Sequence, residues 1–435
     1  MNQSTEKQPV SSWHVSDIRE LARLLTQALP AAIQITEAVH QAVLSGMGIK
    51  GKGEGKTRGI TGFVYRGIHR AADQLGSGVN AVLARVPGPL AQEAIPEPPK
   101  RAALLATLNG VMGDKLVASH NTLATPMTLR YQGAPLNWHA MPPELAGQSR
   151  VLLMVHGLCM NDLQWQTQTK GKDKEQTLNH GEILASTLGY VPIYLRYNSG
   201  LPISQNGREL ASQLAQLVTH WPGHISKISV LAYSMGGLVI RSACHYASQS
   251  EASWPNVLRN LVFLGTPHHG APLEHAGHWL EQLLPATAYT EPFVRLARLR
   301  SAGIKDLRHG TLLDDQDPTR DTASTDPRPP LPLPAGVACF AIAATTAAKR
   351  NLLADRLIGD GLVPLRSALG QHKEARHQLA FAPSHCWIAY RTSHMALLGS
   401  PQVTRQLLHW LTPLHQQAED GCPSEGNAQA VPLAQ

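Results

Sequence analysis

The sequence predicts an α/β fold with a mostly parallel central sheet flanked by helices. Two observations carry this prediction. Short apolar runs with the composition of buried strands recur from residue 151 onward, and helical patterns separate them. Because strand, helix and strand in alternation form βαβ units, neighbouring strands of this kind pair in parallel. The predicted strands cover residues 151–155, 190–195, 228–232, 261–264 and 337–342.

Three amphipathic helical patterns precede the strands and cover residues 18–29, 33–43 and 63–75. The first opens on an N-cap signature, in which Glu20 follows Asp17 by three residues. We therefore expect residues 1–125 to form an N-terminal helical extension. Two roles for it are open. Its apolar stripes can pack on the following domain, or its basic helices can make peripheral contact with an anionic membrane.

Residues 126–415 carry the strand pattern and are expected to form the α/β domain. It opens with a predicted hairpin, whose strands are 127–131 and 136–138. Residues 271–334 interrupt the pattern with short helical pieces and a polar segment rich in Asp and Pro, which predicts a mobile cap or lid. The apolar residues expected to line its acyl path are Leu280, Leu283, Leu284 and Phe293. Residues 416–435 are predicted to be a disordered tail.

The strand pattern at 228–232 runs directly into a helical one, and Ser234 lies at the junction. Ala232-x-Ser234-x-Gly236 is the small-x-Ser-x-small pattern of a nucleophile elbow, a sharp turn that exposes a serine hydroxyl. Small residues are needed because bulkier side chains would collide across so tight a turn. The pentapeptide also occurs by chance, so the strand before it and the helix after it carry the interpretation.

A serine hydroxyl is a weak nucleophile and needs a base, a group that orients the base, and donors for an oxyanion. Asp360 is the predicted acid, because it lies between turn glycines after the strand at 337–342. His394 is the predicted base, because it lies in a loop just before the last helical segment. The order serine, aspartate, histidine along the chain is that of a known class of hydrolases.

Other assignments are open at this point. His385 is the nearest alternative base in a chain of 21 histidines, and Asp355 is the alternative acid, although it lies in a helix-like run. The expected oxyanion donors are the backbone amides of Leu158 and Met235. Cys159 lies in the same loop as Leu158, and we expect it to pack rather than to act as a nucleophile.

Composition excludes several classes of function. The net charge is +7, but the basic residues are spread along the chain, so we expect no nucleic-acid partner. The five cysteines are widely spaced, with no C-x-x-C pair, which is typical of reduced intracellular thiols. The first 14 residues are polar, and no run of 18 apolar residues occurs. We therefore expect a cytoplasmic protein that does not span a membrane.

Five ordered segments together resemble the bacterial triacylglycerol lipases and esterases of the α/β-hydrolase superfamily. They are Val155 to Leu158, Ala232 to Gly237, Leu264 to Gly270, Gly359 to Pro364, and Ser393-His394. The Gly-Thr-Pro-His segment also resembles that of inositol-deacylases that act on lipid-anchor precursors. The resemblance covers residues 150–412 and implies an α/β-hydrolase fold and hydrolysis of carboxylic esters. Calcium ligands carried by several bacterial lipases have no counterpart that we can place.

The resemblance implies that Ser234, Asp360 and His394 form a catalytic triad that cleaves esters of hydrophobic acids or lipids. An acyltransferase on the same triad and a catalytically silent, hydrolase-like binding protein are the alternatives. No cofactor or metal is expected. The histidines His268, His269, His275 and His278 are close in sequence, but the Gly-Thr-Pro-His segment has a structural role in the family, which argues against a zinc site.

Overall fold

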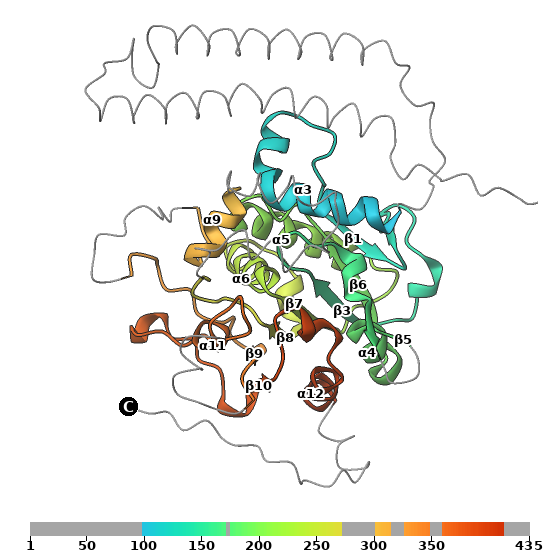
Figure 1. Cartoon of the computed structure of the whole chain (residues 1–435). Helices are drawn as coiled ribbons and strands as arrows, with labels where there is room; N and C mark the ends of the chain where they lie inside the picture. The colour runs from blue at the N-terminus through green and yellow to red at the C-terminus, as the bar shows by residue number, and fades with distance from the viewer. Residues whose placement is uncertain (1–97, 171–174, 272–300, 315–325, 349–358, 413–435) are drawn as a thin grey trace, which may run out of the picture. The chain divides into compact units, whose positions relative to one another are not determined.

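An eight-stranded sheet lies at the centre of the structure, a computed structural model that describes residues 98–170, 175–271, 301–314, 326–348 and 359–412 (Figure 1). Six neighbouring strands of this sheet are parallel, whereas β1 is antiparallel to β6, and β2 to β1. In order across the sheet, the strands are β2 (Ala134–Pro135), β1 (Thr128–Tyr131), β6 (Val191–Arg196), β3 (Arg150–Val155), β7 (Lys227–Tyr233), β8 (Leu258–Leu264), β9 (Ala338–Thr345) and β10 (Cys386–Tyr390). The predicted fold class, α/β with a mostly parallel central sheet, is confirmed.

The parallel strands end at one common edge of the sheet. Val155 at the end of β3 pairs with Ala232 of β7, and Tyr233 at the end of β7 pairs with Leu264 of β8. Leu264 in turn pairs with Ile342 of β9. β7 and β8 are buried along nearly their whole length, which suits their continuous apolar sequences. Loops that follow these strands therefore meet at the same edge, where sites of parallel sheets form.

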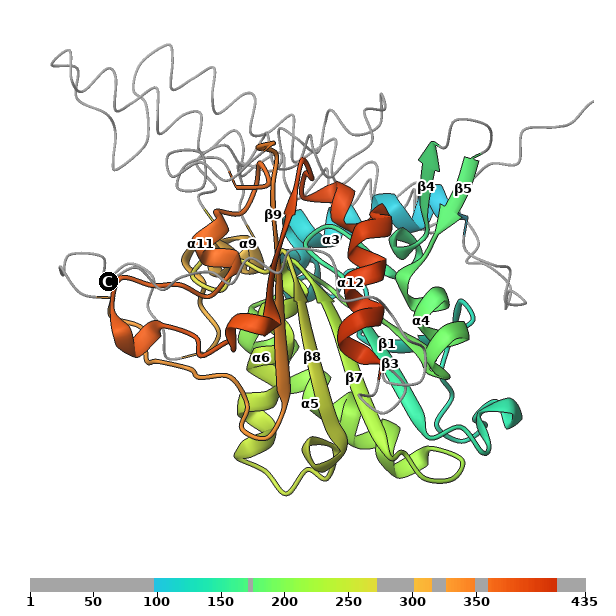
Figure 2. The same ribbon diagram turned by 90° about the horizontal axis from the view of Figure 1, so that it is seen from below.

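Helices cover both faces of the sheet (Figure 2). On one face, α4 (His180–Leu188) and α12 (Pro401–Leu411) contact each other and share an apolar cluster with the strands. The opposite face is covered by α5 (Ile203–His220) and α6 (Met235–Ser248), which pack closely together. A fully buried leucine stabilises the fold by about 2 kcal/mol relative to an exposed one. The apolar cluster under α4 and α12 includes Met154, Leu184, Tyr233, Leu407 and Leu411.

The long helix α3 (Pro99–Ala118) packs across the loops that follow β3 and β6. A side chain at Gly110 would collide with Cys159, and one at Gly113 would collide with Asn198. Asn198 Nδ2 also donates to the carbonyl oxygen of Gly113 at 3.2 Å. These glycines let the helix backbone approach the carboxyl edge of the sheet. The sequence pattern alone does not predict this helix.

The remaining elements are short and lie mostly in the loops. They are the helices α9 (Ala302–His309) and α11 (Leu365–Ala368), the hairpin of β4 (Thr167–Lys170) and β5 (Glu175–Leu178), and the 3-10 turns η1 (Pro143–Leu145), η2 (Asp162–Trp165), η3 (Trp254–Val257), η5 (Ala375–His377), η6 (Pro383–His385) and η7 (Met395–Gly399). Among the described helices, none has the length and apolar character needed to cross a membrane.

The predicted strands lie within the observed ones or overlap them, with one exception: residues 136–138 do not form a strand. Gln132 and Gly133 both have positive φ, 48° and 80°, and make a two-residue turn that pairs Tyr131 with Ala134. The second strand of the hairpin therefore begins at Ala134, two residues before the predicted start at residue 136. It ends one residue later, at a proline that has no N–H to continue the ladder.

Several predictions fall outside the described residues. These are the helical patterns before residue 98, most of the predicted cap with its four lining residues, and the tail. Of the segment predicted as a cap, the structure describes residues 301–314, which include α9, and residues 326–334. Residues 102–120 and the described residues from 124 onward make one compact unit, so most of α3 is part of the sheet domain.

Candidate active site

Ser234 joins β7 to α6 in a strained turn. Its φ of 53° and ψ of −124° lie in a region that non-glycine residues rarely adopt. Two backbone hydrogen bonds hold it there. Ser234 N–H donates to the oxygen of Leu264 at 2.9 Å, and Gly237 N–H donates to the oxygen of Ser234 at 3.0 Å. The strand, strained serine and helix that characterise a nucleophile elbow are therefore all present.

The space around this turn admits only small residues. A Cβ atom at Gly236 would lie 2.6 Å from the backbone oxygens of Val155 and His156, so α6 begins directly against the end of β3. A Cβ atom at Gly157 would lie 3.0 Å from Ser234 Cβ. The loop that follows β3 consequently passes beside the serine.

His394 and Asp360 form a buried pair. His394 Nδ1 lies 2.6 Å from Asp360 Oδ2, and neither side chain is more than 1% exposed. Asp360 Oδ1 accepts hydrogen bonds from the amides of Leu362 at 2.9 Å and Val363 at 2.7 Å, which fix the carboxylate. Because a carboxylate only accepts, the imidazole proton lies on Nδ1. The lone pair of Nε2 is then the one that can accept a proton from a nucleophile.

The histidine packs against the elbow. Its ring centroid lies 4.9 Å from that of Tyr233, the residue before the serine, and Tyr233 Oη donates to the His394 oxygen at 3.1 Å. A Cβ atom at Gly265, where φ is 62°, would lie 3.1 Å from His394 Cε1. Ser234 Oγ has no hydrogen-bond partner among the described residues.

The two predicted oxyanion donors flank the serine. Met235 is the first residue of α6, so its N–H belongs to the first turn, whose amides have no acceptor within the helix. The positive end of the helix dipole reinforces it. Leu158 follows Gly157, the residue that touches Ser234. Both amides thus belong to residues next to the nucleophile or next to a residue in contact with it.

Buried aromatic and polar groups support the loop after β3. The His156 ring stacks on Tyr197 with 4.3 Å between centroids, and Tyr197 Oη donates to the His156 oxygen at 2.9 Å. Burial lowers the pKa of His156 to about 4, so the ring is neutral at pH 7. Burial also raises the pKa of the Cys159 thiol to about 12. A buried, protonated thiol is a poor nucleophile, which agrees with the prediction that Cys159 packs.

A second buried histidine supports the loop that carries His394. His180 Nδ1 lies 2.9 Å from Thr404 Oγ1, and His180 Nε2 lies 3.0 Å from the backbone oxygen of Leu397. A carbonyl oxygen only accepts, so Nε2 carries the proton and Nδ1 accepts from the hydroxyl. This neutral tautomer joins α4 to η7 and α12. Burial lowers the pKa of His180 to about 4.

We expect the free energy of unfolding to fall as the pH decreases from about 6.5 to 4. In that range the unfolded chain binds a proton at His180 and the folded chain does not, so acid favours unfolding. The lowered pKa of His180 alone reduces the free energy of unfolding by about 3 kcal/mol at pH 4, compared with neutral pH. Urea unfolding between pH 4 and 7.5 should show His180→Gln to be less stable at pH 7 but less pH-dependent. The exposed His139→Gln control should keep the native dependence; an equal change in both variants would contradict this role.

The alternative base, His385, lies at the wrong end of its strand. It immediately precedes β10, whereas His394 follows it, and the strand runs parallel to β9. His385 Nδ1 lies 3.1 Å from the Cys339 oxygen, and its ring packs on Phe340 with 4.1 Å between centroids. It is therefore remote from the carboxyl edge. The alternative acid, Asp355, falls outside the described residues.

Two of the four clustered histidines, His275 and His278, also fall outside the described residues. Across the ranges that the structure describes, no group of three or more His, Cys, Asp or Glu side chains could hold a metal ion. His268 lies instead beside a guanidinium, with Arg241 Nη1 3.4 Å from its Nδ1. A cation would be repelled there.

Sequence reasoning did not assign roles to Gly157, Tyr233 and Gly265. The glycines contact Ser234 and the His394 ring, and the tyrosine holds the histidine backbone. A signal was available for Gly265, because it directly follows a buried strand, where glycine often marks close approach of another group. Tyr233 gave no such signal, since an aromatic residue at the end of a buried strand is ordinary core.

Comparisons with known proteins give a distant likeness. Residues 120–299 match the family model described as a domain of unknown function, DUF7379. No curated protein sequence matches the chain. Among solved structures, Bacillus licheniformis lipase BlEst2 in its mature form is similar over 66% of this chain and 98% of its own, with 16% identity and a TM-score of 0.37.

Aspergillus fumigatus lipase B is similar over 90% of this chain and 83% of its own, with 13% identity and a TM-score of 0.34. The NocB thioesterase domain, in a covalent complex with a fluorophosphonate nocardicin G analog, covers 66% of this chain and all of its own at 11% identity and a TM-score of 0.34. The sheet, the elbow and the order of the loops at its edge give the chain an α/β-hydrolase fold.

Proposed function

We propose that this chain is a serine hydrolase that cleaves carboxylic esters through an acyl-enzyme intermediate. The observation that carries the proposal is the strained Ser234 at the carboxyl edge of the sheet, with the buried pair of His394 and Asp360 packed against the same turn. Strained backbone persists only where surrounding bonds enforce it, and it clusters at functional sites. A serine that served only packing would have no need of it.

In the proposed reaction, His394 Nε2 takes the proton of Ser234 Oγ as the oxygen attacks the acyl carbon. Asp360 holds the proton on Nδ1 and stabilises the imidazolium that forms, because its Oδ2 is only 2.6 Å away. The backbone donors on Oδ1 keep that carboxylate from turning. His394 then donates its proton to the leaving alcohol.

The amides of Leu158 and Met235 would bind the tetrahedral oxyanion. Each such donor typically accounts for a factor of about 10²–10³ in turnover. A water molecule, deprotonated by His394, resolves the acyl-enzyme, releases the acid and restores Ser234. No metal or cofactor takes part in these steps. Since Ser234 is only 2% exposed, the site suits an apolar acyl group that excludes water as it binds, such as that of a lipid.

A panel of p-nitrophenyl esters of increasing acyl length, measured with and without detergent, tests the reaction and its substrate class. We expect hydrolysis by the full-length protein, with kcat/KM rising from the acetate to longer acyl chains, because each buried CH2 adds about 0.8 kcal/mol of binding. If this binding energy is also present in the transition state, kcat/KM should rise roughly fourfold for each added CH2. A preference for acetate would contradict an apolar acyl site.

Product analysis with added alcohol separates two readings of the same triad. A hydrolase releases the free acid at all alcohol concentrations, whereas an acyltransferase yields the new ester in preference to acid. A catalytically silent protein would release neither product and would not react with a fluorophosphonate. Absence of both would therefore overturn the proposal.

A further inference from the structure

A second polar site lies beside α6, apart from the nucleophile. It is a small pocket that opens to solvent, and two guanidinium groups and three imidazoles line it. Arg241 is seven residues beyond Ser234 in α6, which places it roughly 10 Å further along the helix. The polar residues that line the pocket are Arg241, His268, His269, Arg328 and His377.

Arg241 is a buried cation without a carboxylate partner among the described residues. Its side chain donates to the oxygen of Leu331 through Nη2 and contacts His268 through Nη1, and its Nε has no partner there. Burial, together with the neighbouring Arg328, lowers its pKa to about 10. A buried charge is costly unless it is paired. Arg241 therefore needs a negatively charged partner in the pocket.

His268 adds a donor whose direction is fixed. A guanidinium only donates, so His268 Nδ1, which lies 3.4 Å from Arg241, must accept. The ring proton is then on Nε2, and this N–H has no partner among the described residues. Phe263 and Phe381 pack against the ring, with centroids 4.8 and 5.5 Å away, and hold its orientation. Two residues that line the pocket thus carry N–H groups without a partner among the described residues, each with almost no surface open to solvent and on a side chain at least 95% buried.

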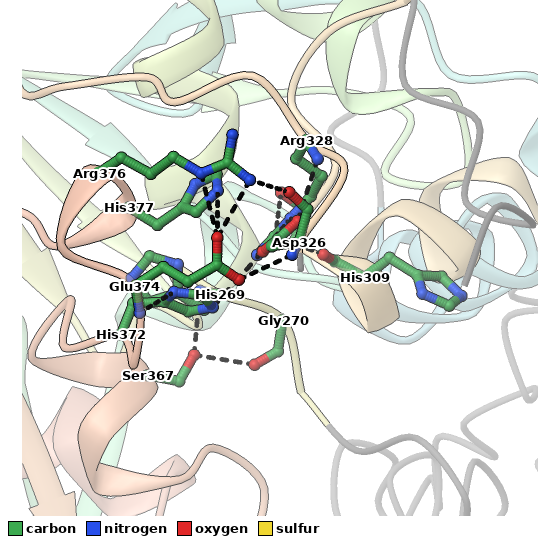
Figure 3. A network of polar contacts seen from close by, with 11 residues as sticks. His269, Gly270, His309, Asp326, Arg328, Ser367, His372, Glu374, Arg376 and His377 are labelled. Atoms are coloured by element: carbon green, nitrogen blue, oxygen red, sulfur yellow. Dashed lines mark hydrogen bonds and ion pairs between the residues drawn. The ribbon is translucent and has the colours of Figure 1, made fainter. Parts of the chain in front are cut away.

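The carboxylates nearest to the pocket are already engaged (Figure 3). Asp326 accepts from Arg328 through both oxygens, and Glu374 accepts from the Asp326 amide and from Arg376. Arg328 also donates to the backbone oxygens of His309, the last residue of α9, and of Gly310. These contacts fix the outer wall. They leave Arg241 Nε–H and His268 Nε2–H without a partner among the described residues, so a ligand of the pocket can pair with them.

Two more imidazole nitrogens without a hydrogen-bond partner among the described residues complete the lining. They are Nε2 of His269 and Nε2 of His377, and the latter lies 4.0 Å from Glu374 Oε2, beyond hydrogen-bond distance. Both rings pack against His372, with centroids 4.9 and 5.0 Å from it. Guanidinium and imidazole N–H groups are typical donors in oxyanion recognition.

We propose that this pocket binds a phosphate group, either as free inorganic phosphate or as part of a larger molecule. Arg241 Nε–H and His268 Nε2–H are the donors, and Arg328, which is paired with Asp326, lines the same pocket. A metal cation is disfavoured because both arginines would repel it. The inference does not depend on ester hydrolysis at Ser234.

Thermal unfolding of the full-length protein in sodium phosphate and in sodium chloride, at pH 7 and equal ionic strength, tests this site. We expect phosphate at about 100 times its Kd to raise Tm by roughly 4 °C. Isothermal titration with phosphate should give one site per chain. Glycerol 3-phosphate in place of phosphate distinguishes the sources: equal binding indicates the phosphate group of a larger molecule, and lost binding indicates the free anion.

Arg241→Met should abolish the phosphate-dependent shift and be at least as stable as the native protein in chloride, because it removes an unpaired buried charge. His268→Phe keeps the ring packing, removes the Nε2 donor, and should weaken binding at least tenfold even if the first variant does not fold. Arg259→Met, a control at an exposed arginine outside the pocket, should keep the full shift. Equal Tm values of the native protein in phosphate and chloride, or an unchanged shift in His268→Phe, would overturn the proposal.

Discussion

Ser234→Ala should abolish ester hydrolysis and labelling by a fluorophosphonate, with a fall in kcat of about 10⁶-fold. The variant removes the nucleophilic oxygen and leaves the turn unchanged, because alanine occupies the same space at Cβ. The backbone hydrogen bonds of Ser234 to Leu264 and Gly237 do not involve its side chain. No side-chain hydrogen bond with a described residue is lost either. Stability should therefore stay within about 0.5 kcal/mol of the native protein.

Labelling with a fluorophosphonate probe and turnover of a short-chain ester measure this directly, and thermal unfolding checks that the variant folds. Ser393→Ala is the matched control, since Ser393 is an exposed serine next to His394. It should keep both labelling and turnover. Labelling that persists in Ser234→Ala would mean that another residue is the nucleophile.

The elbow could be predicted because all its determinants are local. The strand, the serine, the flanking small residues and the helix lie within 13 consecutive residues, and each part supports the same turn. The acid was predictable for a related reason. Asp360 lies between two turn glycines, and a backbone hydrogen bond from Thr346 to the Gly359 oxygen brings that turn to the end of β9.

The choice between His394 and His385 could be ranked from the sequence but not settled. It depends on β10, whose sequence Cys386 to Tyr390 mixes apolar and aromatic residues over only five positions and is half-buried along most of its length. Such a short edge strand gives a weak periodic signal. Once β10 is in place, the two histidines lie at its opposite ends.

The least predictable features rest on contacts between distant parts of the chain. The packing of α3 on the loop after β3 depends on Gly110 meeting Cys159, and a glycine inside a helix argues against that helix from the sequence alone. The phosphate pocket likewise combines α6, the loop after β8 and η5. Two of its histidines, His268 and His269, belong to the cluster in the sequence, whereas His377 does not, and only the structure shows that Arg241 is buried beside His268.

Asp360→Asn and His394→Ala should each lower kcat by about 10³-fold or more, and the double variant should lose little further activity, because the triad acts as one unit. Asparagine can present its NH2 group to Nδ1, which then accepts; the ring proton moves to Nε2, and the base cannot take the proton of Ser234. Kinetics with a p-nitrophenyl ester measure the three losses. His385→Ala, a histidine at the opposite end of β10, is the matched control and should keep at least half of the native kcat. A fully additive double variant, or a larger loss from His385→Ala than from His394→Ala, would show that the base and its partner lie elsewhere.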